Sequence, residues 1–471
     1  MTQKWYRKIP SPVKRLWRLL HTPERPTYLV GGAVRDLLRD VSPHDYDLAS
    51  ARLPHEVVQW AWHHGWRSIP SGLRFGTVSL YDPSEPAMKI EHTTFRREGR
   101  YTDLRHPEDI MWTSRIEDDL ARRDFTINAM AMTWEGRVVD PHGGCHDLDQ
   151  GTISCVGDPC QRLREDPLRM WRAARFVGMD RAGKPFQLDP TLPPLLAKLW
   201  PLLERISPER QRDELWRLLQ STHFYEALRV CDNYGLFMAW WPEWSLTHGF
   251  NQRSRHHLYL LNQHLLHTAK EGPTPLLRLA GLLHDIGKPW SYTLDSQGQG
   301  HFYGHADLGA SWARAMLERL HFDRERTQTV TSLIAHHMYP WERVQAKTLR
   351  RIRREWGGEH VSQLWTLRRM DVIGAGMSSS WEHEEDVKRH WQEALASPDV
   401  FQSLAINGHD IMDWLNVRPS PVVGWWLQHA QAWVDENPDL NNRERLKEKI
   451  LQTAACAPDT RKGPTSHSSA D

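Results

Sequence analysis

The sequence predicts an α+β protein in which a small α/β head is followed by a long helical remainder. Short β-like runs, TYLVGG, GTVSLY and RVVD, alternate with helical stretches between residues 26 and 140. From about residue 152 the apolar residues recur at helical spacing, as in PPLLAKLWPLLERI and PLLRLAGLLHDIG. The length of 471 residues is enough for two to four domains with a substantial core.

These patterns divide the chain into six expected parts. They are a basic N-terminal extension (1–25), the head (26–140), a neck and body (141–245), a histidine-rich metal-binding domain (246–395), a helical tail (396–456) and a disordered polar end (457–471). The basic extension either docks as an amphipathic segment or contacts phosphates. In the neck, Ser207 and Pro208 mark the start of a helix, with the serine as N-cap.

Composition narrows the class of protein. Apolar residues make up 39% and charged residues 25% of the chain, which is ordinary for a globular protein, and no apolar run is long enough to cross a bilayer. The N-terminus lacks the apolar region of a secretory signal. The five cysteines include no CxxC pair, which suits a reducing compartment, so we expect a cytoplasmic protein without a membrane partner. A net charge of +1 neither implies nor excludes a nucleic-acid partner.

The stretch VGGAVRDLLRDVSPHDYDLA indicates a site for a nucleoside triphosphate. Gly31 and Gly32 let the backbone approach phosphates closely at the start of a helix, and Arg35 adds a cation. Asp45 and Asp47 point to one face if the residue between them lies in a strand. Paired carboxylates suit Mg²⁺, and two such ions can activate a hydroxyl and stabilise leaving pyrophosphate. A lone DxD is more often a local cap, but the upstream glycines argue against that reading.

Two further segments add candidate residues to this site. Glu91, in the strand-like KIEHT, is a weaker candidate for a third carboxylate near the metals. In RRDFTINAMAM, residues 122–132, a charged cluster is expected to cap a tightly packed helix and to contact ribose and phosphate. Its candidate residues are Arg122, Asp124 and Asn128. Alone, this motif could equally be a simple capped helix.

The stretch RLREDPLRMWRAARF, residues 162–176, carries a possible base reader. On one helix, Asp166 and Arg169 would share a face. Cytosine and adenine each present an amine donor beside a ring-nitrogen acceptor, whereas guanine and uracil present the opposite order. A carboxylate beside a guanidinium would therefore accept C or A and reject G and U, because unpaired polar groups are costly. The alternative is a surface helix held by ion pairs.

A second group of residues predicts another metal site. Its members are His264, His284, Asp285, His305, His336, His337 and Asp371. Imidazoles and carboxylates are good ligands for borderline divalent metals, and an adjacent His-Asp pair can bind one ion or bridge two. A lone pair of this kind is more often structural, but the full set in mostly helical segments argues against that reading.

Together and in this order, the four motifs of the first 176 residues resemble those of bacterial-type (class II) tRNA nucleotidyltransferases. These CCA-adding enzymes share their head with bacterial poly(A) polymerases. The resemblance implies a polymerase β-like head, a neck with the base-reading helix, and a helical body and tail for tRNA. It implies that Asp45 and Asp47 hold catalytic Mg²⁺ and that CTP and ATP are substrates. The nucleotide-binding residues it implies are Gly31, Gly32, Arg35, Arg122, Asp124, Asn128, Asp166, Arg169, Arg172 and Arg175.

The histidine-rich part resembles HD-superfamily phosphohydrolases. That resemblance implies one or two divalent transition metals, phosphodiesterase or phosphatase activity, and Lys288 as a phosphate contact. Family relationship suggests a 2′,3′-cyclic phosphate or a damaged RNA end as substrate, and relatives with this domain sometimes form homodimers.

The sequence is compatible with more than one activity. Residues 93–107 resemble the flexible loop of this family, which looks shortened in enzymes that add only CC. Because this chain is not shortened there, the resemblance favours full CCA addition, with an A-adding enzyme or a poly(A) polymerase as the next reading. A phosphohydrolase whose head only binds RNA is the alternative of another class, and the intact head carboxylates argue against it. The basic run 346–360 is expected to be either a solvated face or an RNA-backbone patch.

Overall fold

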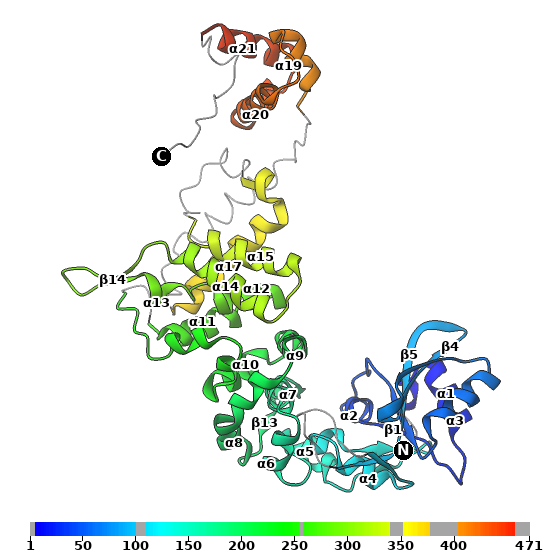
Figure 1. The fold of residues 1–471 in the computed structure, drawn as a ribbon. Coiled ribbons are helices and arrows are strands. Elements are labelled where there is room, and N and C mark those ends of the chain that lie inside the picture. The colour runs from blue at the N-terminus through cyan, green and yellow to red at the C-terminus, as the bar shows by residue number, and fades with distance from the viewer. Residues whose placement is uncertain (1–4, 100–109, 255–257, 340–351, 377–403, 457–471) are drawn as a thin grey trace.

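The computed structural model describes residues 5–99, 110–254, 258–339, 352–376 and 404–456 (Figure 1). Several expectations therefore lie outside the described residues: most of the loop 93–107, the first half of the basic run 346–360, the end of the metal domain and the start of the tail at 377–403, and the polar end 457–471. No described helix is both long enough and apolar enough to span a membrane. Cys145, Cys155, Cys160 and Cys231 are free thiols.

The head is built on a seven-stranded sheet with the strand order β3-β4-β5-β2-β1-β8-β9. The strands are β1 (Tyr28–Val30), β2 (Asp47–Ser50), β3 (Arg67–Gly72), β4 (Thr77–Asp82), β5 (Glu85–Thr94), β8 (Ala131–Met132) and β9 (Val138–Val139). The helices and 3-10 turns around it are η1 (Trp5–Lys8), α1 (Ser11–Leu20), α2 (Gly32–Leu38), α3 (Pro54–His63), η2 (Leu73–Phe75), α4 (Ile116–Ala121) and η3 (Thr126–Asn128). A separate hairpin is formed by β6 (Arg96–Glu98) and β7 (Ile110–Trp112).

The register of the central strands places the acidic residues. Strands β2 and β5 are parallel, and Asp47 lies opposite Glu91 in this pair. Strand β1 runs antiparallel to β2, so that Val30, directly before the glycine pair, lies opposite Asp47. The sheet thus brings together the glycine turn and the carboxylates, which are separated by more than a dozen residues along the chain.

The N-terminal segment is part of the head core and not a separate extension. Helix α1 buries Val13, Leu16, Trp17 and Leu20 completely, which is the apolar stripe expected of an amphipathic helix. The Trp17 indole donates a 2.8 Å hydrogen bond to the carbonyl of Thr27. Of the two interpretations of the basic N-terminus, a docked amphipathic segment is the one that fits α1.

The neck is mainly helical, as expected, but contains short strands as well. Its elements are α5 (Gly144–Gln150), β10 (Thr152–Ile153), α6 (Pro159–Glu165), α7 (Leu168–Val177), β11 (Asp180–Arg181), β12 (Lys184–Pro185), β13 (Gln187–Leu188), α8 (Leu192–Leu199), η4 (Trp200–Arg205), α9 (Pro208–Gln220), α10 (Phe224–Asn233), η5 (Leu236–Ala239) and η6 (Pro242–Thr247). The periodicity missed the two-residue strands because they are shorter than any detectable alternation. Helix α9 begins with Pro208 after Ser207, as the sequence predicts.

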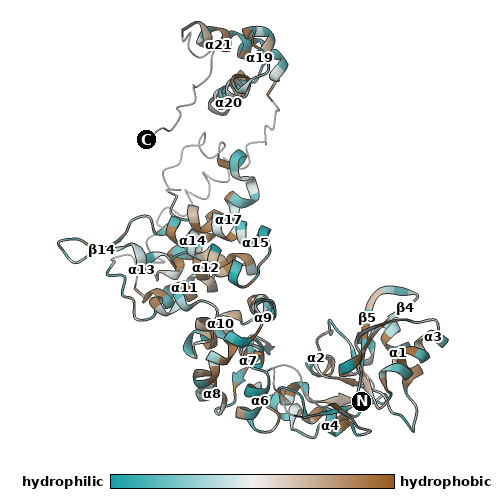
Figure 2. Cartoon of the chain, in the orientation of Figure 1, coloured by the Kyte–Doolittle hydropathy of each residue, from teal (hydrophilic) through white to brown (hydrophobic). Residues whose placement is uncertain are grey.

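Where the structure describes it, the metal domain is a helical bundle with one small hairpin. It comprises α11 (Leu261–Lys270), α12 (Pro275–Leu283), α13 (Lys288–Ser291), β14 (Tyr292–Leu294), β15 (Gly300–Phe302), α14 (His305–Arg319), α15 (Arg324–His336) and α17 (Gly358–Gly374). Apolar residues concentrate where these helices pack together (Figure 2). The tail has its own core, formed by α19 (Gly408–Leu415), α20 (Pro421–Glu436), η8 (Pro438–Leu440) and α21 (Arg443–Cys456).

Candidate functional site

The two aspartates of the DxD motif lie at the start of β2. The strand begins at Asp47, so Asp45 lies in the bend just before it and is exposed. Between them Tyr46 is only 4% exposed and packs into the core, while its carbonyl accepts a 3.1 Å hydrogen bond from the Glu91 amide. The strand conformation on which the same-face argument depends therefore begins one residue later than expected.

The charge around Asp47 fits a bound cation. The pKa of the Asp47 carboxyl is raised to about 6, chiefly by burial; Arg123 opposes this rise, and the negative charges of Glu91 and Asp45 contribute to it. A carboxylate whose ionised form is disfavoured by burial and by like charges is stabilised by a divalent ion. Among the described residues, however, groups of three or more closely spaced metal-ligand side chains occur in the metal domain and do not include these carboxylates.

The glycine turn lies against the side chain of Arg123. Gly31 has φ +68° and ψ −133°, a backbone conformation that suits glycine, and it precedes the first residue of α2. A Cβ added at Gly31 would lie 2.6 Å from Nη1 of Arg123. From α2, Arg35 donates a 2.7 Å hydrogen bond to the side-chain oxygen of Asn128, which joins two of the predicted nucleotide-binding residues.

Residues 122–132 do not form the helix that the sequence suggested. Helix α4 ends at Ala121 with Arg122 as its C-cap, the chain then makes a 3-10 turn at η3, and β8 follows. The reason is tertiary, because β8 is needed as a strand beside β1 in the sheet. Asp119, which is fully buried, forms ion pairs with Arg122 at 2.8 Å and Arg123 at 3.3 Å, so one carboxylate holds both arginines of the doublet.

The predicted base-reading helix is broken into two. Helix α6 ends at Glu165, Asp166 adopts an extended conformation (φ −140°, ψ 98°), and α7 begins after Pro167. The break is caused by Pro167, which lacks an amide donor and disfavours helical geometry in the residue before it. Asp166 and Arg169 therefore do not share a helix face, although the Arg169 amide still donates a 3.0 Å hydrogen bond to the Asp166 carbonyl.

Helix α7 carries three arginines, each paired with a carboxylate from another element. Arg169 pairs with Glu165 at 3.0 Å, Arg172 with Asp124 at 2.5 Å, and Arg175 with Glu214 at 2.6 Å. Burial alone would raise the pKa of the Asp124 carboxyl, but Arg172 and Arg169 outweigh it and hold that pKa well below its usual range. The helix is thereby tied to the head through Asp124, which also accepts a 3.1 Å hydrogen bond from the Asn128 amide.

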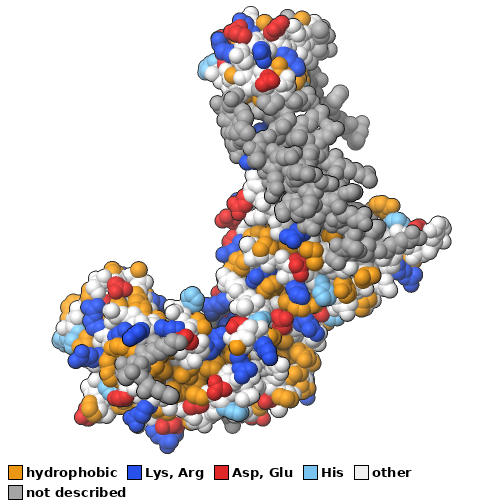
Figure 3. Space-filling view, turned by 180° about the vertical axis from the view of Figure 1, so that it is seen from behind, with side chains coloured by type: hydrophobic (Ala, Val, Ile, Leu, Met, Phe, Trp, Pro, Cys, Tyr) orange, Lys and Arg blue, Asp and Glu red, His pale blue; other side chains and the backbone are white. Residues whose placement is uncertain are grey.

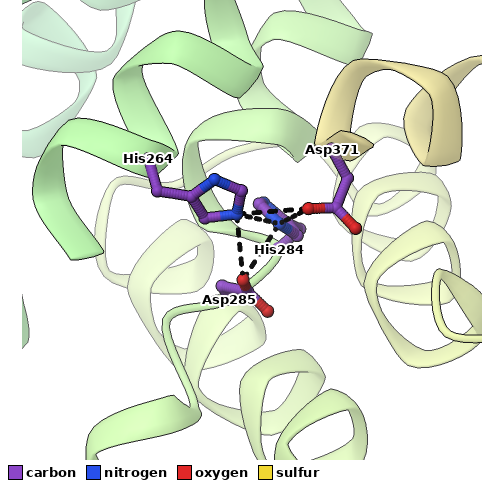
Figure 4. Close-up of side chains that lie close together, drawn as sticks. All are labelled: His264, His284, Asp285 and Asp371. Carbon is purple, nitrogen blue, oxygen red and sulfur yellow. Dashed lines mark hydrogen bonds and ion pairs between the residues drawn. The ribbon is translucent and has the colours of Figure 1, made fainter. Parts of the chain in front are cut away.

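The histidine-rich part forms a buried cluster of metal-ligand groups (Figure 4). Its first group brings together His264 from α11, His284 and Asp285 after α12, and Asp371 from α17. Nε2 of His264 lies 3.1 Å from Asp285 Oδ2 and 3.2 Å from Asp371 Oδ1. Nε2 of His284 lies 3.2 Å and 3.4 Å from the same two oxygens.

A second group of ligands shares Asp285 with the first. The other carboxylate oxygen of Asp285, Oδ1, lies 3.2 Å from Nε2 of His305 and 3.5 Å from Nε2 of His337. The two imidazoles approach each other to 3.3 Å. Asp285 therefore presents one oxygen to each group, which is the arrangement of a carboxylate that can bridge two ions.

Backbone carbonyls orient three of these imidazoles. Nδ1 of His284 lies 2.9 Å from the carbonyl oxygen of Gly281. Nδ1 of His305 lies 2.6 Å from that of Phe302, and Nδ1 of His337 lies 2.6 Å from that of Ile334. Because a carbonyl only accepts, each Nδ1 carries the proton and donates it. Each Nε2 lone pair is then directed into the cluster, as in metal sites. The donor set and its orientation fit a divalent transition metal.

His336 is not part of the cluster, which corrects the predicted ligand set. Its Nδ1 bonds to the carbonyl of Ser332 one turn earlier, and its ring packs on Trp356 at 4.1 Å. Adjacent residues at the end of a helix point in different directions, so only His337 reaches the site. Lys288 is 4% exposed, lies 2.5 Å from Asp285 and donates to Gln252 at 2.7 Å.

One residue of the head site was not assigned by the sequence. Arg123 is adjacent to Gly31 and contributes to the electrostatics of Asp47, yet only its neighbour Arg122 was proposed as a nucleotide contact. The arginine doublet itself was the available signal, because either member could have faced the glycine turn.

Comparison with known families agrees with this geometry. Residues 27–154 match the poly A polymerase head domain, residues 185–246 the probable RNA and SrmB-binding site of polymerase A, and residues 256–375 the HD domain. These matches follow the head, neck and metal cluster in order. The head is a poly A polymerase head domain, the domain of a nucleotidyltransferase. The HD domain that follows contains both ligand groups of the described residues.

Relatives of this nucleotidyltransferase match it over nearly its full length. A CCA-adding enzyme of Anoxybacillus flavithermus is 29% identical, with 94% of this chain and 96% of the relative covered. The crystal structure of the Bacillus stearothermophilus CCA-adding enzyme in complex with CTP is similar with a TM-score of 0.68, at 24% identity over 97% of this chain and 100% of that one. The Thermotoga maritima CCA-adding enzyme complexed with tRNA has a TM-score of 0.59, at 19% identity over 95% and 97%. The two structures support the fold.

Proposed function

We propose that this protein adds CCA to the 3′ end of tRNA, without a nucleic-acid template, from CTP and ATP. One observation carries the proposal: Asp166 and Arg169, whose hydrogen-bonding groups complement cytosine and adenine, lie on a neck that is fastened to the head. The Arg172–Asp124 ion pair makes this connection. Curated relatives of nearly the same length are CCA-adding enzymes, which supports the same activity.

The residues divide the reaction between them. Asp45 and Asp47 would hold Mg²⁺, which when bound activates the attacking 3′ hydroxyl and neutralises charge on the departing pyrophosphate. Arg35, Asn128 and Arg123 lie at the glycine turn and, together with Arg122, would bind ribose and triphosphate. On the face shown in Figure 3, Lys and Arg side chains are spread over the head and neck among apolar groups, which suits contact with an RNA backbone. The free cysteines support a cytoplasmic location.

The activity is tested by stepwise incorporation. Purified protein is incubated with tRNAs that end before CCA, after C and after CC, each with one labelled nucleotide at a time. We expect label from CTP on the first two and from ATP on the third. Incorporation of ATP alone on the CC-ended tRNA would instead indicate an A-adding enzyme, and long ATP tails a poly(A) polymerase.

A variant of the head tests whether its proposed metal site carries out the incorporation. Asp45→Ala should abolish incorporation, because it removes a proposed metal ligand from an exposed position where folding is not at risk. Asp149→Ala, at another exposed aspartate, serves as the matched control and should retain incorporation. Retained incorporation in Asp45→Ala would show that the metal strand has been assigned wrongly.

We also propose a metal-dependent phosphohydrolase activity for the HD domain. The specific support is Asp285, whose two oxygens face two ligand groups, while Lys288 beside it supplies a cation for a phosphate. A 2′,3′-cyclic nucleotide and a phosphorylated RNA end are the substrates to test, with Mn²⁺, Ni²⁺ or Co²⁺ added. Asp285→Asn should remove hydrolysis and leave CCA addition intact. Hydrolysis that persists in this variant would contradict the assignment.

A further inference from the structure

We propose that Arg210 is a positioning residue that selects the nucleobase by holding the carboxylate of Asp166 in its reading orientation. The inference rests on the proposed function, in which Asp166 and Arg169 read the incoming base. It adds a residue from a different helix, α9, which does not itself touch the nucleotide.

Asp166 needs an external constraint because it is not in a helix. It follows the last residue of α6 and precedes Pro167, in an extended conformation. A side chain within a helix has its direction set by the helix, whereas one in a two-residue junction does not. Its carboxylate is 18% exposed, so it remains accessible to a ligand.

Both carboxylate oxygens of Asp166 are held. Oδ1 accepts a 3.1 Å hydrogen bond from the Leu168 amide, and Oδ2 accepts a 3.0 Å hydrogen bond from Nη2 of Arg210. The backbone contact alone would allow the carboxylate to rotate about it. The guanidinium removes that freedom and directs the remaining lone pairs, which must accept from the base amine.

Helix α9 is itself firmly placed against α7. Glu214, one turn after Arg210 on the same face, pairs with Arg175 at 2.6 Å and lies 3.9 Å from Arg172. At the start of α9 the side chain of Gln211 is buried and donates to the carbonyls of Leu203 and Ile206, at 3.0 Å and 2.8 Å. Arg210 therefore projects from a fixed support, as a positioning residue must.

The partner reader is restrained in a parallel manner. Arg169 donates to the Glu165 carboxylate at 3.0 Å and to the Arg162 carbonyl at 2.9 Å, and Glu165 is held in turn by Arg162 at 2.8 Å. Each reader thus has its own support: Glu165 for the guanidinium and Arg210 for the carboxylate. Loss of either supporting contact should reduce discrimination between bases more than it slows transfer of the correct nucleotide.

The experiment compares Arg210→Met with the wild type for all four nucleotides. We expect the ratio of kcat/KM for CTP over UTP on C-accepting tRNA to fall about tenfold or more, since a hydrogen bond to a charged group is lost. The ratio for ATP over GTP on CC-ended tRNA should fall likewise. Arg210→Lys retains a cation and should recover part of the discrimination. Binding of CTP and UTP without tRNA, by equilibrium dialysis, gives a second measure of the same ratio.

One control variant separates positioning from folding. Arg217→Met changes an exposed arginine on the same helix and should leave both ratios unchanged. Equal loss of rate for every nucleotide in Arg210→Met, or unchanged ratios, would overturn the positioning role while leaving the proposed function standing. A wild type that fails to prefer CTP and ATP would overturn the proposed function and this inference together.

Discussion

Arg172 in the neck forms a 2.5 Å ion pair with Asp124 in the head. Asp124 is 8% exposed and also accepts hydrogen bonds from the Phe125 amide at 2.8 Å and from Asn128 at 3.1 Å. The pair joins α7, which carries the proposed base reader Arg169, to the turn that holds the predicted ribose and phosphate contacts. We therefore expect the proposed base selection and chemistry to depend on this buried connection between neck and head.

Removal of the arginine from this pair should destabilise the protein. Arg172→Met leaves the Asp124 carboxylate buried without its main cation, which should lower the free energy of unfolding by about 3 kcal/mol. Denaturant unfolding followed by tryptophan fluorescence measures the change. Arg164→Met, at an exposed arginine of α6, is the matched control and should cost less than about 0.5 kcal/mol. Equal losses in the two variants would contradict a special role for the pair.

Gly31→Ala should weaken nucleotide binding. The new Cβ would adopt a conformation suited to glycine and would meet Nη1 of Arg123 at 2.6 Å, so the guanidinium must move away from the glycine turn. Gly65→Ala has a comparable positive φ of +70° but no atom within 4 Å, so it carries the backbone strain without the contact. We expect a higher Kd for CTP in Gly31→Ala than in Gly65→Ala. Equal affinities would show that Arg123 is not needed there.

His337 and His336 should differ sharply in their effect on metal binding. His337→Ala removes a buried imidazole whose Nε2 faces Asp285, and should weaken divalent metal binding by more than about tenfold. His336→Ala removes an imidazole that packs on Trp356 outside the cluster, and should leave metal affinity unchanged. Metal content after dialysis at defined free metal distinguishes the two. A loss in the His336 variant would return that residue to the ligand set.

His92 should make the protein less stable as the pH falls below 6.5. The imidazole is fully buried in β5 and contacts Ser50 at 2.8 Å, and burial lowers its pKa from 6.5 to about 3, with Arg52 adding to the shift. Between these values the unfolded chain binds a proton that the folded protein does not, so unfolding is favoured. At pH 5 the loss of stability is about 2 kcal/mol.

A His92→Val variant isolates this contribution. Its stability should depend less on pH between 5 and 7 than that of the wild type, whatever its stability at pH 7. His63→Gln, at an exposed histidine of α3, should retain the wild-type slope. Unfolding free energies at several pH values give both slopes, and parallel curves for the wild type and His92→Val would disprove the assignment.

Much of the architecture could be predicted because it follows from local patterns in the sequence. Helical periodicity identified α8 and α12, Ser207 and Pro208 marked the start of α9, and short β-like runs identified the head. The order of the glycine pair, the DxD motif and the Glu-Asp-x-x-Arg motif pointed to the family. Pro167 was also visible, and its effect on the preceding residue could have predicted that the base-reading segment is two helices.

Other features depend on contacts between residues that are far apart in the chain. Periodicity could not show that α1 completes the head core, that residues 131–132 pair with β1, or that Arg210 from α9 reaches Asp166. The choice of His337 over His336 as a ligand depends on where α12, α14 and α17 lie around the end of α15. Residue types and their spacing specify which chemistry is available, whereas interatomic distances across the core arise when all the elements pack together at once.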